Sequence, residues 1–276
     1  MLIFTNQNFK VEKRTIGLTM AKYLIFSNAV EIPIPDYKGK NFDTFQQICI
    51  LRRWEFFEIE IIYLQDGINL ELDYIAYFSI DLEVDNLVTG VENKNTPPIL
   101  ISGKILRLRN QDWNKRRAKL MSIKYKQKIK WTAKLDKITT TRNSFINNYL
   151  HKSACFIINH CLEQKIGNIS FGELKHIKDN VQLGKRNNQN FVSIPIQKLK
   201  QMITYKAELV GITVIEVDKA YTLKCSALDR EPIKKHKKYV GKRIKRGFSK
   251  GSNYLLNADV NGSLNILRKV IGDGFI

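Results

Sequence analysis

The alternation of apolar and polar residues predicts β-strands in the first quarter of the chain. Residues 22–35 and 46–64 are rich in β-branched and aromatic side chains, and proline and glycine residues punctuate the segment between the two runs. The second run alternates between polar and apolar residues over positions 58–62. We therefore expect residues 1–70 to form a small antiparallel β unit, which is too short to close a barrel of its own.

A second group of strands is predicted from residue 74 onward. Residues 74–84 alternate strictly, so the two faces of a strand would differ. One face would carry Ala76, Phe78, Ile80 and Leu82, and the other Tyr77, Ser79, Asp81 and Glu83. The apolar runs 86–91 and 98–106 follow, and turn-forming residues separate them. The pattern indicates an antiparallel meander with an aspartate in its first strand.

The rest of the chain alternates between helical and strand patterns. Apolar spacing of three and four predicts a helix over 139–165, and Pro195 would open a second helix that ends at Gly211. Short strands are expected at 167–174 and 212–218, a loop at 179–190, and a final helix at 257–270, with Asn257 or Asp259 in its cap region. This order suits an α/β fold of the RNase H type, with a helical insertion at about 104–165 after the third strand.

The charge balance points to a polyanionic partner. The chain has 46 Lys and Arg residues against 26 Asp and Glu, a formal net charge of +20, and such a surplus favours binding to a phosphate backbone. Two blocks concentrate the charge, because residues 104–137 hold thirteen Lys or Arg and residues 234–250 hold nine. The candidate phosphate-contacting residues are Arg107, Arg109, Lys115, Arg116, Arg117, Lys119, Lys185, Arg186, Lys242, Arg243, Lys245 and Arg246. A solvated helix face is the alternative for these charges, and Trp113 and Trp131 could stack on bases or pack in the core.

Composition excludes other classes of protein. No apolar run approaches the roughly 18 residues that span a bilayer, so we expect no membrane association. Cys49, Cys155, Cys161 and Cys225 form no CxxC pair, and no secretory leader precedes them. The sequence therefore predicts a cytoplasmic protein with reduced thiols.

Two aspartates are candidates for metal chemistry. Nucleases of the RNase H type hold two divalent ions about 4 Å apart with carboxylates from the first strand, a later strand and a C-terminal helix. Asp81 fits the first position and Asp259 the third. Mg²⁺ or Mn²⁺ would suit such oxygen ligands. Each residue also has a structural alternative, Asp81 as a surface residue near a turn and Asp259 as a helix N-cap.

Ordered motifs resemble one family over most of the chain from about residue 20. The segment SIDLEVDNLVT resembles the first RuvC motif of the transposon-encoded TnpB (OrfB) family, and NADVNGSLNIL resembles its third motif. The segments between them, including the GKRIKRG run, look like one branch of that family. The resemblance implies an RNA-guided DNA endonuclease related to type V CRISPR effectors, with guide RNA and target DNA as partners. It also implies that Asp81 and Asp259 are metal-binding catalytic residues.

The same resemblance implies a division into domains. Residues 1–70 would be a partial, wedge-like remnant of the guide-RNA-holding β-barrel, and residues 71–223 the RuvC-like core. Residues 224–253 would be a degenerate, basic zinc-ribbon region, and residues 254–276 the helix of the last RuvC motif.

The sequence departs from the family pattern at three places. The second RuvC motif normally ends its strand with a glutamate, where this chain has Gly172; Glu173 or Glu208 could replace it. In a strand one step reverses the facing, so Glu173 could do so only if the strand end bulges or twists. Of the two CxxC pairs of the family's zinc ribbon only Cys225 remains, and Leu228 stands in its partner's place, so zinc is not expected. The segment before the nuclease core is also shorter than in the family.

Three functions therefore stay open at the level of the sequence. The first is a metal-dependent endonuclease that uses Asp81, Asp259 and a displaced glutamate. The second is a DNA- or RNA-binding protein that does not cleave, or a decayed transposase remnant. The third is a ribosome-associated RNA-binding protein, which the ordered motif matches disfavour.

Overall fold

The structure is a computed structural model, and the chain divides into two compact units, Met1–Asp66 and Gly67–Ile276. The described residues are 2–5, 7, 9–16, 19–26, 31–34, 45–52, 56–68, 70–94, 96–129, 132–173, 194–245 and 247–276.

The first unit consists of two antiparallel three-stranded sheets. One has the order β1 (Leu2–Thr5), β5 (Phe45–Arg52), β6 (Phe57–Tyr63), and the other the order β2 (Phe9–Ile16), β3 (Thr19–Phe26), β4 (Glu31–Ile34). Leu24 of β3 and Ile48 of β5 are fully buried and belong to one small apolar cluster. The strands predicted within 22–35 and 46–64 are therefore confirmed, although each run is interrupted and contributes parts of two strands.

The second unit is built on one five-stranded mixed sheet with the order β11-β10-β7-β8-β9. Strands β7 (Asp73–Asp81), β8 (Asn86–Glu92) and β9 (Ile99–Ser102) form the predicted antiparallel meander. Strands β10 (Ile166–Gly172) and β11 (Thr213–Val217) extend it, each parallel to its neighbour. The predicted α/β class is thus confirmed for this unit.

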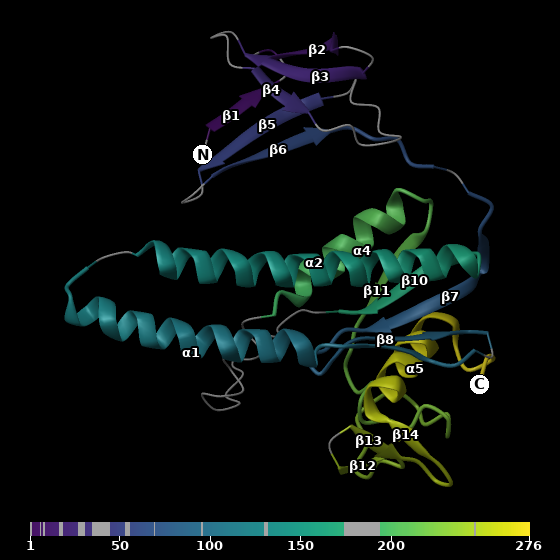
Figure 1. Ribbon diagram of the computed structural model, residues 1–276. Helices are drawn as coiled ribbons and strands as arrows, with labels where there is room; N and C mark the ends of the chain where they lie inside the picture. The colour runs from purple at the N-terminus through teal and green to yellow at the C-terminus, as the bar shows by residue number, and fades with distance from the viewer. Residues whose placement is uncertain are drawn as a thin grey trace. The chain divides into compact units, whose positions relative to one another are not determined.

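Two long helices form a hairpin between β9 and β10. Helix α1 (Lys104–Lys126) and helix α2 (Ala133–Glu163) run side by side and extend beyond the sheet (Figure 1). We predicted a helix over 139–165. Helix α2 begins at Ala133 instead, so the predicted start was wrong by six residues. Thr132 caps the helix by accepting a hydrogen bond from the backbone N–H of Leu135, and Asp136 lies in the first turn, where a carboxylate is favourable.

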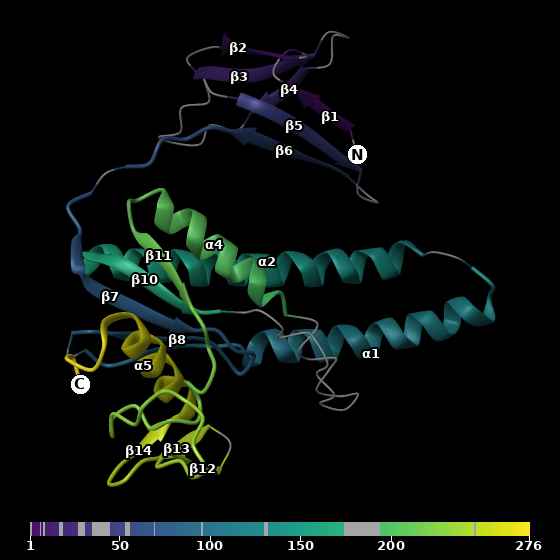
Figure 2. The ribbon, with the colours of Figure 1, turned by 180° about the vertical axis from the view of Figure 1, so that it is seen from behind.

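Helices cover both faces of the sheet. Helices α2 and α4 (Ile196–Glu208) lie on one face and α5 (Ala258–Ile271) lies on the other, as the reverse view also shows (Figure 2). Pro195 precedes α4 as predicted, while the helix ends three residues before Gly211. The predicted loop at 179–190 lies outside the described residues. None of the helices of the described part is long and apolar enough to cross a bilayer.

The main core lies between the sheet and helices α2 and α4. Its fully buried side chains include Phe78, Ile80, Leu150, Ile157, Ile169, Phe171, Leu199 and Ile203. A smaller apolar cluster on the other face contains Val91 of β8 with Val260 and Leu267 of α5. Because β7 is buried on both faces, any polar side chain at its carboxyl end must find a partner inside the protein.

The segment between β11 and α5 is compact although it has few regular elements. It ends in a small antiparallel sheet of β12 (Lys242–Lys245), β13 (Phe248–Lys250) and β14 (Leu255–Asn257). The buried Glu231 carboxylate accepts hydrogen bonds from the backbone N–H groups of Ser226, Val240 and Gly241 at 2.7, 2.9 and 3.3 Å. This carboxylate therefore joins two turns of the segment.

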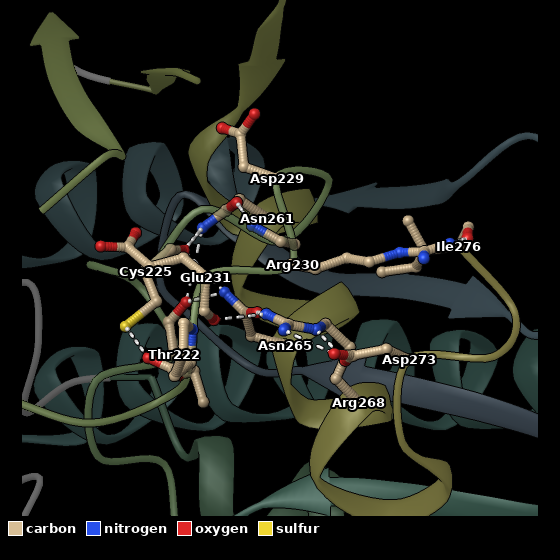
Figure 3. Close-up of polar contacts among 12 residues, drawn as sticks. Thr222, Cys225, Asp229, Arg230, Glu231, Asn261, Asn265, Arg268, Asp273 and Ile276 are labelled. Carbon is tan, nitrogen blue, oxygen red and sulfur yellow. Dashed lines mark hydrogen bonds and ion pairs between the residues drawn. The ribbon is translucent and has the colours of Figure 1, made fainter. Parts of the chain in front are cut away.

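Helix α5 is tied to this segment by amide and guanidinium groups (Figure 3). The side-chain amides of Asn261 and Asn265 each donate to the carbonyl of Cys225, at 2.9 and 2.7 Å. Arg268 donates to the carbonyl of Glu231 at 3.0 Å and forms an ion pair with Asp273. The polar face of α5 is therefore fixed in position by backbone carbonyls of the preceding segment.

Candidate acidic site and nucleic-acid interface

Asp81 and Asp259 are brought to the same face of the sheet. Asp81 is the last residue of β7, and Asp259 lies in the first turn of α5, which packs on β7. Two reciprocal hydrogen bonds fix this packing, because the Ser79 hydroxyl donates to the carbonyl of Ser263 at 3.0 Å and the Ser263 hydroxyl donates to that of Ser79 at 2.7 Å. The pairing of strand and helix therefore brings the two predicted aspartates close enough to interact electrostatically.

Both structural alternatives for these aspartates were wrong. Asp81 is 1% exposed, so it is not a surface residue near a turn. The N-cap of α5 is Asn257, whose side-chain oxygen accepts from the backbone N–H groups of Asp259 and Val260 at 2.8 and 3.4 Å. Asp259 is itself 7% exposed, and its carboxylate accepts a 2.7 Å hydrogen bond from the side-chain amide of Asn86.

The third carboxylate near this pair is Glu83, two residues after Asp81. Burial raises the pKa of Glu83 to about 7, and the charges of Asp81 and Asp259 add to the rise. Burial also raises the pKa of Asp81, although a nearby lysine opposes it. The three carboxylates therefore influence one another, and the side chain of Asp81 is 1% exposed whereas that of Glu83 is 33% exposed.

Lys219 is the cation of this cluster. It lies two residues after β11, and its ammonium forms an ion pair with Asp81 and lies 3.7 Å from Oε1 of Glu83. Burial alone would lower the pKa of Lys219, but Asp81 and Glu83 outweigh burial and raise it. The lysine is therefore held in its charged form.

The stem of Lys219 passes over the position where the second motif normally has a glutamate. A Cβ atom at Gly172 would lie 3.2 Å from both Cγ and Cδ of Lys219, and 2.9 Å from Cδ1 of Ile266. These separations are tighter than ordinary van der Waals contact. A larger residue at position 172 thus requires Lys219 and Ile266 to move.

Of the two glutamates proposed as replacements, Glu173 directly follows β10 and Glu208 ends α4. The pairing of β10 with β7 shifts register between Ile166 and Asn168, at the start of the strand, and then runs without a shift to Phe171. The pairing with β11 runs without a shift as far as Gly172, so the described pairing has no bulge at the carboxyl end of β10 that would reverse the facing of Glu173. Glu208 is the last residue of α4, and its carbonyl lies near Gly67, before the start of β7, whereas Asp81 is at the end of β7. Glu208 therefore lies toward the opposite end of that strand.

The carboxylates present do not fit a two-metal centre. Among the described residues, no three His, Cys, Asp or Glu side chains come together as ligands for a metal ion. One oxygen of Asp81 contacts the Lys219 ammonium, and the other lies 2.8 Å from the place where a Cβ at Gly262 would be. Asp81 is thus enclosed between the Lys219 ammonium and the backbone of α5. The site as it stands supports no metal-dependent step.

A second candidate site is the groove between α1 and α2. It is lined by Arg109, Asp112, Trp113, Arg116, Lys134, Lys137, Ile138, Thr141 and Arg142. Trp113 donates to the Thr139 hydroxyl at 3.4 Å, and the guanidinium of Arg142 lies 5.1 Å from the Trp113 ring centroid. Trp113 therefore packs within the helical hairpin, while basic side chains surround it at the surface.

The other predicted basic residues have different surroundings. Arg107 forms an ion pair with Asp85. The side chains that extend the basic surface along α1 and β12 are exposed, and they are Lys115, Arg117, Lys119, Lys242, Arg243 and Lys245. Lys185, Arg186, Arg246 and Trp131 lie outside the described residues.

The sequence reasoning missed Glu83, Lys219 and Asn86. The strand alternation had placed Glu83 on the same face as Asp81, which was a usable signal. Asn86 lies within the segment that resembles the first RuvC motif, but it was not singled out. Lys219 carried no catalytic signal of its own, because only the pairing of β11 with β10, beside β7, brings it to the site.

Cys225, the remaining cysteine of the zinc-ribbon pattern, is buried. Its thiol lies 3.4 Å from the carbonyl of Pro232 and 3.7 Å from that of Lys234. Burial raises the pKa of this thiol. The Cys225 side chain is therefore an element of the packing of this segment.

Two family models match the chain within its second unit. The model described as a probable transposase (OrfB of IS605) matches residues 76–178. The model described as a Cas12f1-like TNB domain matches residues 197–266. The first match includes Asp81 and the α1–α2 hairpin, and the second includes Lys219 and Asp259.

Known relatives agree with these matches. The chain is 31% identical over 122 residues to the CRISPR-associated endodeoxyribonuclease Cas12f1 of Sulfoacidibacillus thermotolerans, covering 42% of this chain and 25% of that protein. A Cas12f ternary complex matches with a TM-score of 0.53 and 18% identity, over 81% of this chain and 46% of its own. A complex of Cas12f1 with sgRNA and target DNA matches with a TM-score of 0.54 and 15% identity, over 94% and 45%. The chain spans less than half the length of each of these proteins.

The fold and the matches together define a class and a family. The second unit has an α/β nuclease-type fold of the kind seen in Cas12f complexes. The two family matches and the Cas12f1 relative together support a TnpB/OrfB-type family related to the type V CRISPR effectors.

Proposed function

We propose that this chain is a nucleic-acid-binding protein that holds a guide RNA and a DNA target. The observation that carries the proposal is the basic groove between α1 and α2. Helix α1 has nine Lys or Arg residues and a single acidic residue, Asp112, which pairs with Arg116. Arg107 also pairs with Asp85, while the exposed Lys115, Arg117 and Lys119 are available to phosphate groups.

The identities of the nucleic acids come from the relatives. One matching structure contains sgRNA and target DNA by its own description. We propose the same two partners here, with the groove and the exposed basic strand β12 contacting phosphates.

The five-stranded sheet supports an RNase H-like (RuvC) core. Its first three strands form an antiparallel meander, and two later strands add in parallel beside the first. We propose that residues 71–223 form this core, with the basic insertion at about 104–165. Residues 224–253 would be a zinc-ribbon region without its zinc ligands, residues 254–276 would carry the last RuvC motif, and residues 1–70 would be the remnant of a guide-binding barrel.

RNA-guided cleavage of DNA is the second candidate function. The convergence of buried Asp81 and Asp259 on one face favours it, because carboxylates at these places would hold Mg²⁺ in a nuclease of this class. Two features argue against cleavage: Gly172 stands in the place of the family's glutamate, and Lys219 forms an ion pair with Asp81. Plasmid cleavage with Mg²⁺ and co-purified RNA, compared with an Asp81→Ala variant, decides between binding and cleavage.

Binding itself is tested by fluorescence anisotropy with single-stranded RNA and duplex DNA. Charge reversal of Lys134 and Lys137 should weaken binding and flatten its dependence on salt by about 0.7 in log–log slope for each lost contact with a single strand. Lys198→Glu is the matched control, because Lys198 is exposed on α4 and does not line the groove. Equal losses in the groove variants and in the control would remove the groove from the proposal.

A further inference from the structure

We propose that Lys219 serves as the resident cation of the acidic cluster, so that the native chain excludes divalent metal from Asp81 and holds nucleic acid without cutting it. The statement that nucleic acid is held without being cut rests on the proposed function, because it requires that the chain binds nucleic acid. It decides between the two candidate functions given above.

The stem of Lys219 lies in the space beside Gly172. The Cγ and Cδ atoms of Lys219 lie 3.2 Å from the place that a Cβ at residue 172 would take. The family's glutamate would begin at this Cβ, so the stem of Lys219 would have to leave its observed path to admit that side chain. The absence of a side chain at Gly172 and the position of Lys219 are thus sterically linked.

Lys219 also affects the electrostatics of the cluster. The Lys219 ammonium forms an ion pair with Asp81 and lies 3.7 Å from Glu83, and the lysine side chain is only 18% exposed. A positive charge at this position attracts both carboxylates and repels a second cation. A divalent ion would have to displace a buried ammonium from a carboxylate that is almost fully shielded from water.

The remaining carboxylate of the cluster is Asp259. Asp259 accepts a 2.7 Å hydrogen bond from Asn86, and the residue's backbone N–H donates to the cap residue Asn257 at 2.8 Å. These contacts fix the Asp259 carboxylate without a metal. Asp81 and Glu83 thus share Lys219 and Asp259 has Asn86, while the buried Oδ2 of Asp81 has no hydrogen-bond partner within the described part of the chain.

The experiment is a titration of the full chain with Mn²⁺, in which electron paramagnetic resonance measures the free ion. We expect that Asp81 binds no Mn²⁺ in the native chain. Any saturable Mn²⁺ binding of the native chain should therefore be unchanged in Asp81→Asn. Lys219→Met keeps the length of the stem and removes the charge, and should gain one Mn²⁺ site at least about tenfold tighter than any in the native chain. Lys235→Met, at an exposed position, is the control for the same change of net charge.

Two results would overturn the inference. One is saturable Mn²⁺ binding by the native chain that disappears in Asp81→Asn, a measurement that stands even if Lys219→Met does not fold. The other is a folded Lys219→Met variant, verified by its circular dichroism melt, that gains no more Mn²⁺ affinity than Lys235→Met does. RNA binding is measured separately in EDTA. A lack of RNA binding would refute the proposed function, whereas the role of Lys219 is tested by the Mn²⁺ titration alone.

Discussion

Lys219 and Gly172 occupy complementary space, since the stem of the lysine lies 3.2 Å from the place of the Cβ that the glycine lacks. The first prediction follows from this contact. Gly172→Ala should destabilise the second unit by about 1–3 kcal/mol, because the methyl group would also approach Ile266 to 2.9 Å. Urea unfolding measures the loss.

A double-mutant cycle separates the two neighbours of position 172. Combining Gly172→Ala with Lys219→Ala should recover part of the loss that steric crowding causes. Gly274→Ala is the control, because a Cβ at residue 274 meets no atom within 4 Å. Strictly additive effects of the two substitutions would show that the lysine stem yields freely.

The second prediction concerns the carboxylate that organises the segment before α5. Glu231→Gln should lower the free energy of unfolding by about 1.5–3 kcal/mol, because the buried Glu231 accepts three backbone N–H groups and the amide retains a single acceptor oxygen. Thermal melts with and without added zinc measure the change. Glu163→Gln, at an exposed position, provides the control, and a rescue by zinc would contradict our account of the segment.

The third prediction uses the four cysteines as reporters of packing. Cys155 is exposed, whereas Cys49, Cys161 and Cys225 are buried. Burial raises the pKa of Cys161 to about 12, so its reactive thiolate is scarce at neutral pH. A disulfide reagent such as DTNB should modify one thiol rapidly in the native chain and four after denaturation.

Substitution of the exposed cysteine tests this assignment. Cys155→Ser should remove the rapid phase and leave the slow phases unchanged. A rapid phase that persists in this variant would mean that one of the buried cysteines is accessible.

The fourth prediction concerns acid. The hydrogen bond from Arg268 lowers the pKa of Asp273 below its ordinary value of 3.8. A carboxyl group with a lowered pKa stabilises the folded state above its ordinary pKa, and this contribution disappears as the pH falls through the folded-state value. Asp273→Asn should therefore be less stable than the native chain at pH 7, and the difference should shrink once the pH falls below 3.8 and disappear below the folded-state pKa.

Unfolding curves at a series of pH values measure this difference. Asp66→Asn is the control, because Asp66 is exposed and belongs to the first unit. A gap between Asp273→Asn and the native chain that stays constant down to pH 3 would show that the ion pair with Arg268 is not its source.

The sequence predicted the elements well where periodicity was strong. The meander of β7, β8 and β9 and the helix before Gly211 follow from side-chain alternation and spacing, which are local properties. The start of α2 was missed because Thr132 and Asp136 mark it by capping, at positions without an apolar repeat. Local signals thus sufficed for most elements and failed at a helix end.

The acidic site was predicted only in part. Asp81 and Asp259 belong to motifs, so their meeting could be expected from the family resemblance. The role of Lys219 could not, because its position depends on the pairing of β11 with β10 and on the empty space above Gly172. Glu173 and Glu208 were considered as replacements for the glutamate missing at position 172, whereas Glu83, two residues after Asp81, was not considered although it interacts with Asp81 electrostatically.

The reciprocal hydrogen bonds between Ser79 and Ser263 join residues that are 184 positions apart. Closing so long a loop costs chain entropy before any contact repays it, and such contacts form late in folding. The α1–α2 hairpin, by contrast, consists of neighbours in sequence. We therefore expect the α1–α2 hairpin to form before the acidic cluster is assembled. The docking of α5 is then the step that first brings Asp259 to Asp81.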